Sequence, residues 1–141
     1  MTRFLLDTNV ISELTRDTPD PHVTEFISRQ EELWLASLVV YELEFGLELL
    51  PPGRRRDRVS LANAMVISAF EDHVLPLDRV GAEWGARFRV SARRRGRPIR
   101  LADALIAGTA MANDLTLATR NIRDFEGLGV RIINPWEHGS T

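Results

Sequence analysis

The chain has 141 residues, of which 44% are hydrophobic and 27% charged, and its formal net charge at pH 7 is −2. These values are typical of one globular domain, and they exclude a disordered chain and a membrane-spanning one. The sequence has no cysteine, which excludes disulfides, thiolate metal sites and cysteine nucleophiles. We therefore predict a single domain over residues 1–141. Because Asp7 interrupts the first apolar run before a signal peptide could form, we expect a cytoplasmic protein that does not contact a membrane.

Short apolar runs alternate with helical segments along the chain. The runs predict strands, and the segments between them predict helices, of which the last is rich in small residues and must be buried on most sides. Strands separated by helices imply crossover connections, and hence an α/β fold with a central, mainly parallel five-stranded sheet and helices on both faces. The predicted strands cover residues 4–6, 33–36, 74–77, 115–119 and 130–133, and the predicted helices cover about 10–15, 22–32, 37–50, 53–72, 78–96 and 101–112.

The helix that follows the second predicted strand carries a mixed pattern. Ser37 is expected as its N-cap, because a serine oxygen can accept a hydrogen bond from an N–H of the first turn. Glu42 lies among apolar positions, where a glutamate is seldom buried without a partner. The apolar positions recur at the three-and-four spacing of a buried stripe, and they are Leu38, Tyr41, Phe45 and Leu49.

Acidic and amide side chains follow the predicted strands at one edge of the sheet. Asp7 ends the first strand, Glu42 lies in the second turn of the helix that leaves the second strand, and Asp103 lies in the first turn of the buried helix. Asn121 and Asp124 follow the fourth strand. Helices that follow parallel strands begin at the carboxyl edge of the sheet, which is where ligands bind, so we expect these side chains to share one crevice.

Several carboxylates in one cleft repel one another, and some would take up protons unless a cation lay between them. Oxygen ligands suit Mg²⁺, for which Mn²⁺ can substitute. Such a centre can orient a phosphate, lower the pKa of a bound water and stabilise the leaving oxygen, and a nearby carboxylate can act as general base. The pattern therefore predicts metal-assisted hydrolysis of a phosphodiester.

Each acidic residue also has a purely structural interpretation. Asp7 can be a helix N-cap, Asp103 can interact with the helix dipole, and Asp124 can cap the turn before Phe125. Glu42 can reach solvent from the end of its stripe. Any one of these positions alone would be weak evidence for a catalytic centre, whereas their occurrence at one sheet edge favours such a centre.

All eighteen basic residues are arginine, and many of them are clustered. The clusters indicate either a local surface for phosphate or an acidic partner, or solvated helix faces. The first cluster contains Arg54, Arg55, Arg56 and Arg58, and the second contains Arg87, Arg89, Arg93, Arg94, Arg95, Arg97 and Arg100.

In the order and spacing of four motifs, the sequence resembles the PIN-domain family. The closing segment, residues 130–136, is similar to the VapC-type toxin branch of that family, particularly its FitB-like subgroup. The resemblance covers the whole chain. The motifs are residues 6–14 (LDTNVISEL), 40–43 (VYEL), 103–107 (DALIA) and 119–125 (TRNIRDF).

The resemblance implies a Mg²⁺-dependent endoribonuclease that acts as the toxin of a type II toxin–antitoxin pair. It assigns Asp7, Glu42 and Asp103 to the metal-binding acidic centre. Many family members have an aspartate where this chain has Asn121, so either Asn121 fills the fourth role as a neutral ligand or water-positioning group, or Asp124 substitutes. With one fewer strong ligand, any second metal site is expected to be weak.

The resemblance also implies partners. They are an antitoxin whose tail covers the active cleft, an RNA substrate such as tRNA, and a second copy of the chain in a homodimer, with higher-order assembly with the antitoxin left open. The arginine clusters can serve antitoxin contacts or RNA phosphates.

Other functional classes fit less well. Receiver domains share an essential lysine, and this chain has no lysine. A related phosphatase would have a second aspartate two positions after Asp7, where this chain has Asn9. A PIN-like scaffold that binds RNA or protein with little catalysis remains the alternative. Metal-dependent cleavage that is lost in Asp7→Asn would distinguish the enzyme from the scaffold.

Overall fold

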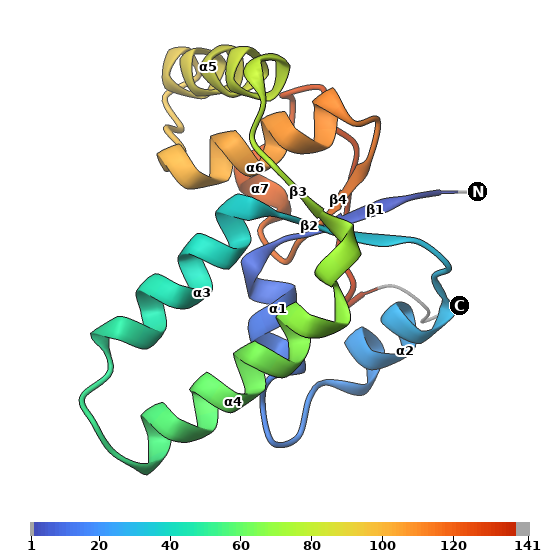
Figure 1. Cartoon of the computed structure of the whole chain (residues 1–141). Helices are drawn as coiled ribbons and strands as arrows, with labels where there is room; N and C mark the ends of the chain where they lie inside the picture. Colours follow the sequence, from blue (N-terminus) through green and yellow to red (C-terminus); the bar gives the residue numbers. More distant parts are fainter. Residues whose placement is uncertain (1, 138–141) are drawn as a thin grey trace.

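The computed structural model describes residues 2–137, which form a central parallel sheet with helices on both faces (Figure 1). The strand order is β3-β2-β1-β4-β5, and all four neighbouring pairs are parallel. The predicted fold class is therefore confirmed. The strands are β1 (Phe4–Leu6), β2 (Leu33–Ala36), β3 (Val74–Leu75), β4 (Thr116–Ala118) and β5 (Ile132–Ile133).

The helices connect these strands as crossovers. In Figure 1, α5 and α6 lie on one side of the strands and α1, α2 and α4 lie on the other. Asp7, Asp20 and Asp78 cap α1, α2 and α5 through their side chains. The helices are α1 (Thr8–Leu14), α2 (Pro21–Arg29), α3 (Ser37–Leu49), α4 (Arg54–Ala69), α5 (Arg79–Arg94), α6 (Leu101–Ala112) and α7 (Ile122–Phe125), with a 3₁₀ turn at Glu71–His73.

Strand β1 is the centre of the sheet and of the core. It pairs with β2 on one side and β4 on the other, and Leu5 and Leu6 are fully buried. A strand buried on both faces has to be apolar along its whole length, which explains the run Phe4–Leu6. Asp7 follows at the carboxyl edge, where its backbone N–H donates to Ala118 O at 2.9 Å.

Helix α3 differs from its prediction in which face is buried. Its core-facing residues are Val39, Leu43 and Leu47, whereas Tyr41 and Phe45 are more than half exposed. The predicted buried stripe of Leu38, Tyr41, Phe45 and Leu49 is therefore wrong, with Leu38 alone partly buried against the core. The helix has apolar residues on two faces, and spacing alone cannot say which of them meets the sheet.

The predicted N-cap of α3 is also wrong. Ala36 occupies the N-cap position without a side-chain hydrogen bond, and Ser37 is the first helical residue. The cause is the direct passage from β2 into α3 without an intervening loop residue.

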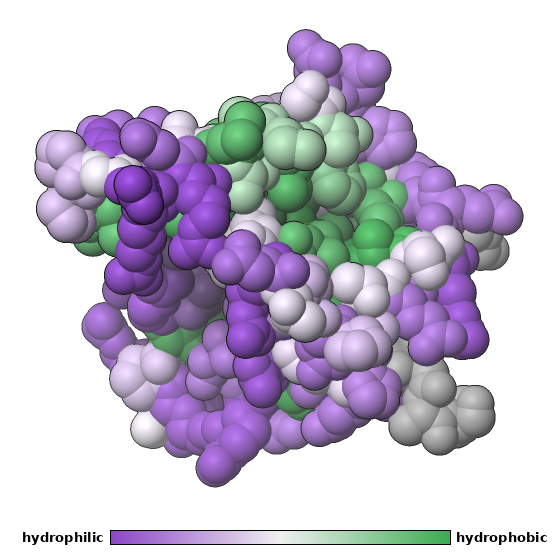
Figure 2. Space-filling model, turned by 90° about the horizontal axis from the view of Figure 1, so that it is seen from below, coloured by the Kyte–Doolittle hydropathy of each residue, from purple (hydrophilic) through white to green (hydrophobic). Residues whose placement is uncertain are grey.

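Apolar side chains reach the surface as well. Figure 2 shows an apolar area on one face of the molecule, bordered by hydrophilic side chains. Helices α3 and α4 form a hairpin (Figure 1), and Leu61 and Met65 of α4 are exposed. Within residues 2–137, none of the helices combines the length and the apolar character needed to span a bilayer.

Helices α5 and α6 pack with unusually close backbones, and this contact yields a stability prediction. A Cβ on Gly108 of α6 would collide with the backbone oxygen of Gly81 on α5. Gly108→Ala should therefore lower the free energy of unfolding by about 2 kcal/mol or more, because neither backbone can yield without separating the helices. Urea denaturation measures the effect.

The matched control is Gly46→Ala in α3, where an added Cβ would have no neighbour within 4 Å. Alanine is the better helix former, so this variant should be neutral or more stable by up to about 1 kcal/mol. Equal stabilities for the two variants would contradict the close α5–α6 contact.

Candidate metal centre

Three carboxylates converge in one open pocket of about 1050 Å³. Asp7 comes from the end of β1, Glu42 from α3 and Asp103 from the first turn of α6, and each offers one oxygen within 4.8 Å of the others. Strand β1 ends and helix α3 begins at the carboxyl edge of the sheet, and α6, which follows α5, brings Asp103 to the same edge. The predicted convergence of these three residues is therefore seen in the structure.

Asp7 is the most deeply buried of the three, with 3% of its surface exposed. Its pKa is raised from 3.8 to about 6. Burial is the main cause and the charges of Asp103 and Glu42 add to the rise, whereas hydrogen bonds from Thr119 and Thr8 oppose it. The Thr119 hydroxyl donates to Oδ2 at 2.7 Å and the Thr8 N–H donates to Oδ1 at 2.8 Å. These bonds fix the orientation of the carboxylate.

Glu42 has the partners that its place in α3 requires. The Thr8 hydroxyl donates to Oε1 at 2.6 Å, and the Arg100 guanidinium donates to Oε2 at 2.6 Å. The glutamate side chain is 14% exposed. It is therefore directed into the pocket rather than out to solvent, which argues against the interpretation that it merely ends an apolar stripe.

Asp103 shares the same arginine. Arg100 Nε lies 3.3 Å from Oδ2 and Arg100 Nη2 lies 3.3 Å from Oδ1, a two-bond contact between residues three apart in sequence. Hydrogen bonds to Asp103 and Glu42 raise the pKa of Arg100 above its ordinary value, so the guanidinium stays charged. The arginine itself is 68% exposed, at the rim of the pocket.

The two candidates for the fourth position are separated by the fold. Asn121 lines the same pocket as the three carboxylates, and its backbone N–H donates to the Thr119 hydroxyl at 3.1 Å. Asp124 lies exposed on α7 and lines a second pocket with Arg123 and Glu126, and Asn121 lines that pocket as well. Asn121 thus reaches the pocket that contains the three carboxylates, and Asp124 is not among the residues that line it.

Sequence reasoning did not single out the residues that orient the carboxylates. Thr8 and Asn9 directly follow Asp7, and Asn9 Nδ2 lies 3.4 Å from Asp7 Oδ2. Thr119 is the residue after β4, and its sequence neighbourhood gives no sign of its bond across the sheet to Asp7. The role of Arg100 could have been predicted in part, because an arginine three positions before an aspartate on a helix can form an ion pair with it.

The donor set fits a divalent cation. All three side chains offer carboxylate oxygens, the ligands that Mg²⁺ and Mn²⁺ prefer. Asp7 accepts hydrogen bonds from hydroxyl, amide and backbone groups, and one of its oxygens lies within 4.8 Å of oxygens of Glu42 and Asp103. The arrangement can hold a cation at the bottom of a pocket open to a large substrate.

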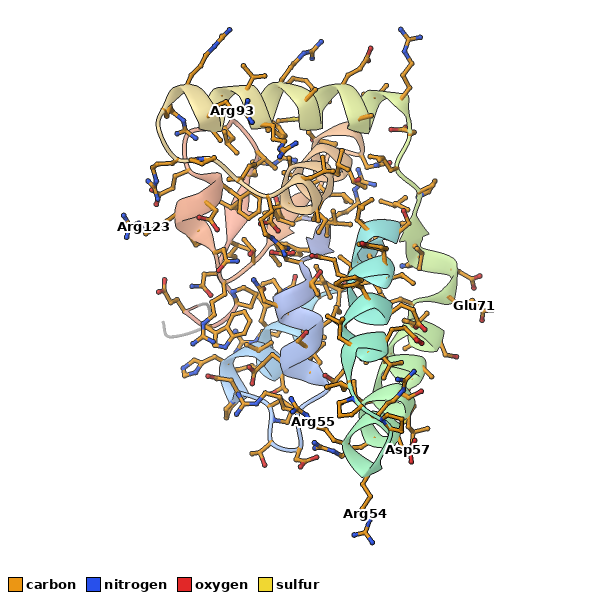
Figure 3. The ribbon with its side chains drawn as sticks, turned by 90° about the vertical axis from the view of Figure 1, so that its left-hand side faces the viewer. Arg54, Arg55, Asp57, Glu71, Arg93 and Arg123 are labelled. Carbon is orange, nitrogen blue, oxygen red and sulfur yellow. The ribbon has the colours of Figure 1, made fainter. Side chains whose placement is uncertain are left out.

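The two arginine clusters lie at opposite ends of the molecule. Figure 3 shows Arg54 projecting at the tip of the α3–α4 hairpin and Arg93 on α5 at the other end. Within the first cluster, Arg56 and Arg58 pair with Glu48 and Asp17. The clusters therefore do not form one continuous basic surface, and of their members it is Arg100 that contacts the acidic centre.

Comparison with known proteins agrees with the fold. The PIN-domain model matches residues 4–129, and the chain belongs to the PIN-domain family. The VapC ribonuclease Y4jK of Sinorhizobium fredii is 41% identical over 137 residues, which cover 95% of this chain and 98% of that protein. The toxin FitB of Neisseria gonorrhoeae is 35% identical, over 94% of this chain and 98% of that one.

Two further relatives bear on function and structure. The tRNA(fMet)-specific endonuclease VapC of Shigella flexneri is 29% identical, over 96% of this chain and 99% of that protein. The crystal structure of FitAcB from Neisseria gonorrhoeae superposes with a TM-score of 0.84 at 34% identity, over 95% of this chain and 99% of that one. The predicted resemblance to the VapC and FitB-type toxins is confirmed at the level of the family.

The raised pKa of Asp7 predicts a pH-dependent stability in metal-free protein. Above pH 6 the folded state carries a buried charge, and as the pH falls through about 6 the folded state takes up a proton before the unfolded state does. Asp7→Asn removes that charge, so in EDTA it should stabilise the fold by about 1–3 kcal/mol at pH 8.

The advantage of Asp7→Asn should shrink as the pH is lowered toward 4, where the wild-type carboxyl is neutral in the folded state. Urea denaturation at several pH values measures it. A stability difference that does not change with pH would contradict the raised pKa, because altered hydrogen bonds alone would act equally at every pH.

Proposed function

We propose that the chain is a Mg²⁺-dependent endoribonuclease and the toxin of a type II toxin–antitoxin pair. The observation that carries this proposal is the convergence of Asp7, Glu42 and Asp103 in an open pocket of a PIN-domain fold. The nuclease and toxin names of its relatives support it. The alternative, a catalytically weak scaffold, does not require three partly buried carboxylates to face one another.

Asp7, Glu42 and Asp103 would hold the cation, which we propose is Mg²⁺ with Mn²⁺ as a substitute. When bound, such a cation orients the scissile phosphate, lowers the pKa of a coordinated water and stabilises charge on the leaving oxygen. The protein contributes fixed geometry. The hydroxyl of Thr119 holds Asp7 and that of Thr8 holds Glu42, so two of the three carboxylates are oriented before the cation arrives.

We assign the fourth position of the centre to Asn121 rather than Asp124. Asn121 lines the pocket, whereas Asp124 lies on α7 outside it. An amide cannot act as general base, so its role would be to position a water or the substrate. One neutral side chain in place of a carboxylate also weakens any second cation site.

The proposed substrate is structured RNA, with tRNA as the first candidate. The pocket is open enough for a large substrate, and a VapC relative is named as a tRNA(fMet)-specific endonuclease. Action on RNA beside an antitoxin would place the protein in the cytoplasm. The homodimer expected from the family resemblance, and any larger assembly with the antitoxin, stay predictions.

We propose that the antitoxin docks on the exposed side of α3. Tyr41 and Phe45 are 58% and 52% exposed, their rings stack at 5.9 Å, and both line the pocket that holds Glu42. An apolar segment seated there would cover the entrance to the acidic centre. In support, the similar structures include FitAcB from Neisseria gonorrhoeae, a DNA-bound VapBC from Salmonella typhimurium and a toxin–antitoxin complex from Klebsiella pneumoniae.

Replacement of Asp103 tests the catalytic proposal. Asp103→Asn should abolish RNA cleavage, because it removes one of three charged ligands, while the fold persists since the substitution relieves repulsion in the cluster. Asp124→Asn is the matched control, the same chemical change outside the pocket, and should keep cleavage within about threefold of wild type. Purified protein is incubated with tRNA in Mg²⁺ or EDTA.

The outcomes separate the enzyme from the scaffold. Discrete products that need Mg²⁺ and vanish in Asp103→Asn support the ribonuclease. A wild-type protein that binds tRNA but leaves it intact in Mg²⁺ and Mn²⁺ would favour the scaffold. If Asp124→Asn loses RNA cleavage although Asn121 is unchanged, the fourth position of the metal centre belongs to Asp124 and not to Asn121.

The docking proposal predicts a weaker toxin–antitoxin complex when the apolar face of α3 is made polar. Phe45→Ser should raise the Kd for the antitoxin by about tenfold or more, as expected for an aromatic anchor. Val90→Ser on α5, a similarly exposed residue on another helix, should change it less than about twofold. Calorimetric titration with the antitoxin checks both, and equal effects of the two variants would contradict this docking site.

A further inference from the structure

Arg100 competes for the oxygens that a cation would use. Its guanidinium lies 2.6 Å from Glu42 Oε2 and 3.3 Å from each oxygen of Asp103. A guanidinium only donates hydrogen bonds, and a metal ion binds the same lone pairs on the carboxylates. Arg100 and a bound cation would therefore compete for the same lone pairs of Glu42 and Asp103. In this geometry Arg100 supplies a positive charge to Glu42 and Asp103.

The other arginines that line the pocket are engaged elsewhere. Arg16 pairs with Glu13 at 3.0 Å, and Arg120 lies over the Trp136 ring at 4.8 Å. Arg100 instead stands at the N-cap position of α6 with a side chain that is 68% exposed. It can leave the carboxylates without disturbing the core, because its long side chain lies at the rim of the pocket.

The substrate creates a need for such a group. An RNA phosphodiester is an anion, and to reach the candidate cation site it has to approach a cluster of three carboxylates. A divalent cation and one guanidinium together balance the charge of those carboxylates. The planar fork of arginine also matches two phosphate oxygens at once, which a point charge does not.

We propose that Arg100 is a substrate-binding residue that changes partners. It holds Glu42 and Asp103 while the cation is absent, and it turns to the RNA phosphate once the cation takes those carboxylates. The inference rests on the proposed function, because it needs the same cation and a phosphodiester substrate.

Cation affinity in the absence of nucleic acid tests the first half. Mn²⁺ is titrated by calorimetry into wild type, Arg100→Gln and the control Arg120→Gln. Without its competitor the centre should bind Mn²⁺ about three- to tenfold more tightly in Arg100→Gln. Arg120→Gln removes a charge from the same pocket without a contact to the carboxylates, so its Kd should stay within about twofold of wild type, because salt screens the interaction.

Two results would contradict the competition between Arg100 and the cation. One is an unchanged Kd in Arg100→Gln. The other is equal tightening in both variants, since pocket charge rather than direct contact would then be the cause. Thermal melting in EDTA shows that each variant is folded.

Affinity for a phosphodiester tests the second half. The probe is a short fluorescein-labelled single-stranded DNA that gels show to remain uncut, and its anisotropy is measured in Mn²⁺ and in EDTA. Arg100→Gln should weaken DNA binding by about threefold or more in Mn²⁺, where Arg100 is free to reach phosphate, and by less than about twofold in EDTA, where wild-type Arg100 is held by the carboxylates. In Mn²⁺, the DNA affinity of Arg100→Lys should lie between those of wild type and Arg100→Gln.

An equal loss in Mn²⁺ and EDTA would overturn the change of partners, because it would show a permanent phosphate contact. The result also separates this inference from the function on which it rests. If wild type binds no Mn²⁺, the metal centre and the inference fall together. If wild type binds Mn²⁺ and cleaves RNA while Arg100→Gln matches it in both assays, only the inference fails.

Discussion

The repulsion among three carboxylates in one pocket is the constraint on which the site depends. The fold produces it, because β1, α3 and α6 all deliver an acidic side chain to the carboxyl edge of the sheet. The surroundings of the three carboxylates differ. Asp7 is buried under hydroxyl and amide donors and titrates near pH 6, while Glu42 and Asp103 share one exposed guanidinium. A divalent cation bound among the three carboxylates would offset their mutual repulsion.

Stability and function are coupled through β1. The same short strand whose leucines are fully buried between β2 and β4 is followed by Asp7, so a fully buried part of the core sets the position of the most buried carboxylate. Helix α6 packs closely on α5, because glycines let the two backbones approach each other. The parts that face partners lie on the outside, with Tyr41 and Phe45 on α3 and Arg100 at the pocket rim.

Much of this arrangement could be predicted from the sequence, for a physical reason. Buried strands and helices with capping aspartates leave local patterns, so the parallel sheet, β2, α6 and the three carboxylates were predicted in place. Which face of α3 is exposed could not be predicted, because its two apolar faces have the same spacing. Only tertiary packing determines that Val39 is buried and Tyr41 exposed. Thr119 and Arg100 were missed as site residues because their bonds cross 112 and 58 positions of sequence to Asp7 and Glu42.

The central claim is that Asp7, Glu42 and Asp103 form one cation site. The most direct test is a crystal structure of the protein soaked in Mn²⁺, with anomalous scattering measured near the manganese edge. The account predicts an anomalous peak between the three carboxylates, each of them contributing an oxygen, with the guanidinium of Arg100 turned away from Glu42 and Asp103. No peak in the pocket, or a peak bound by other residues while Arg100 still holds the two carboxylates, would contradict it.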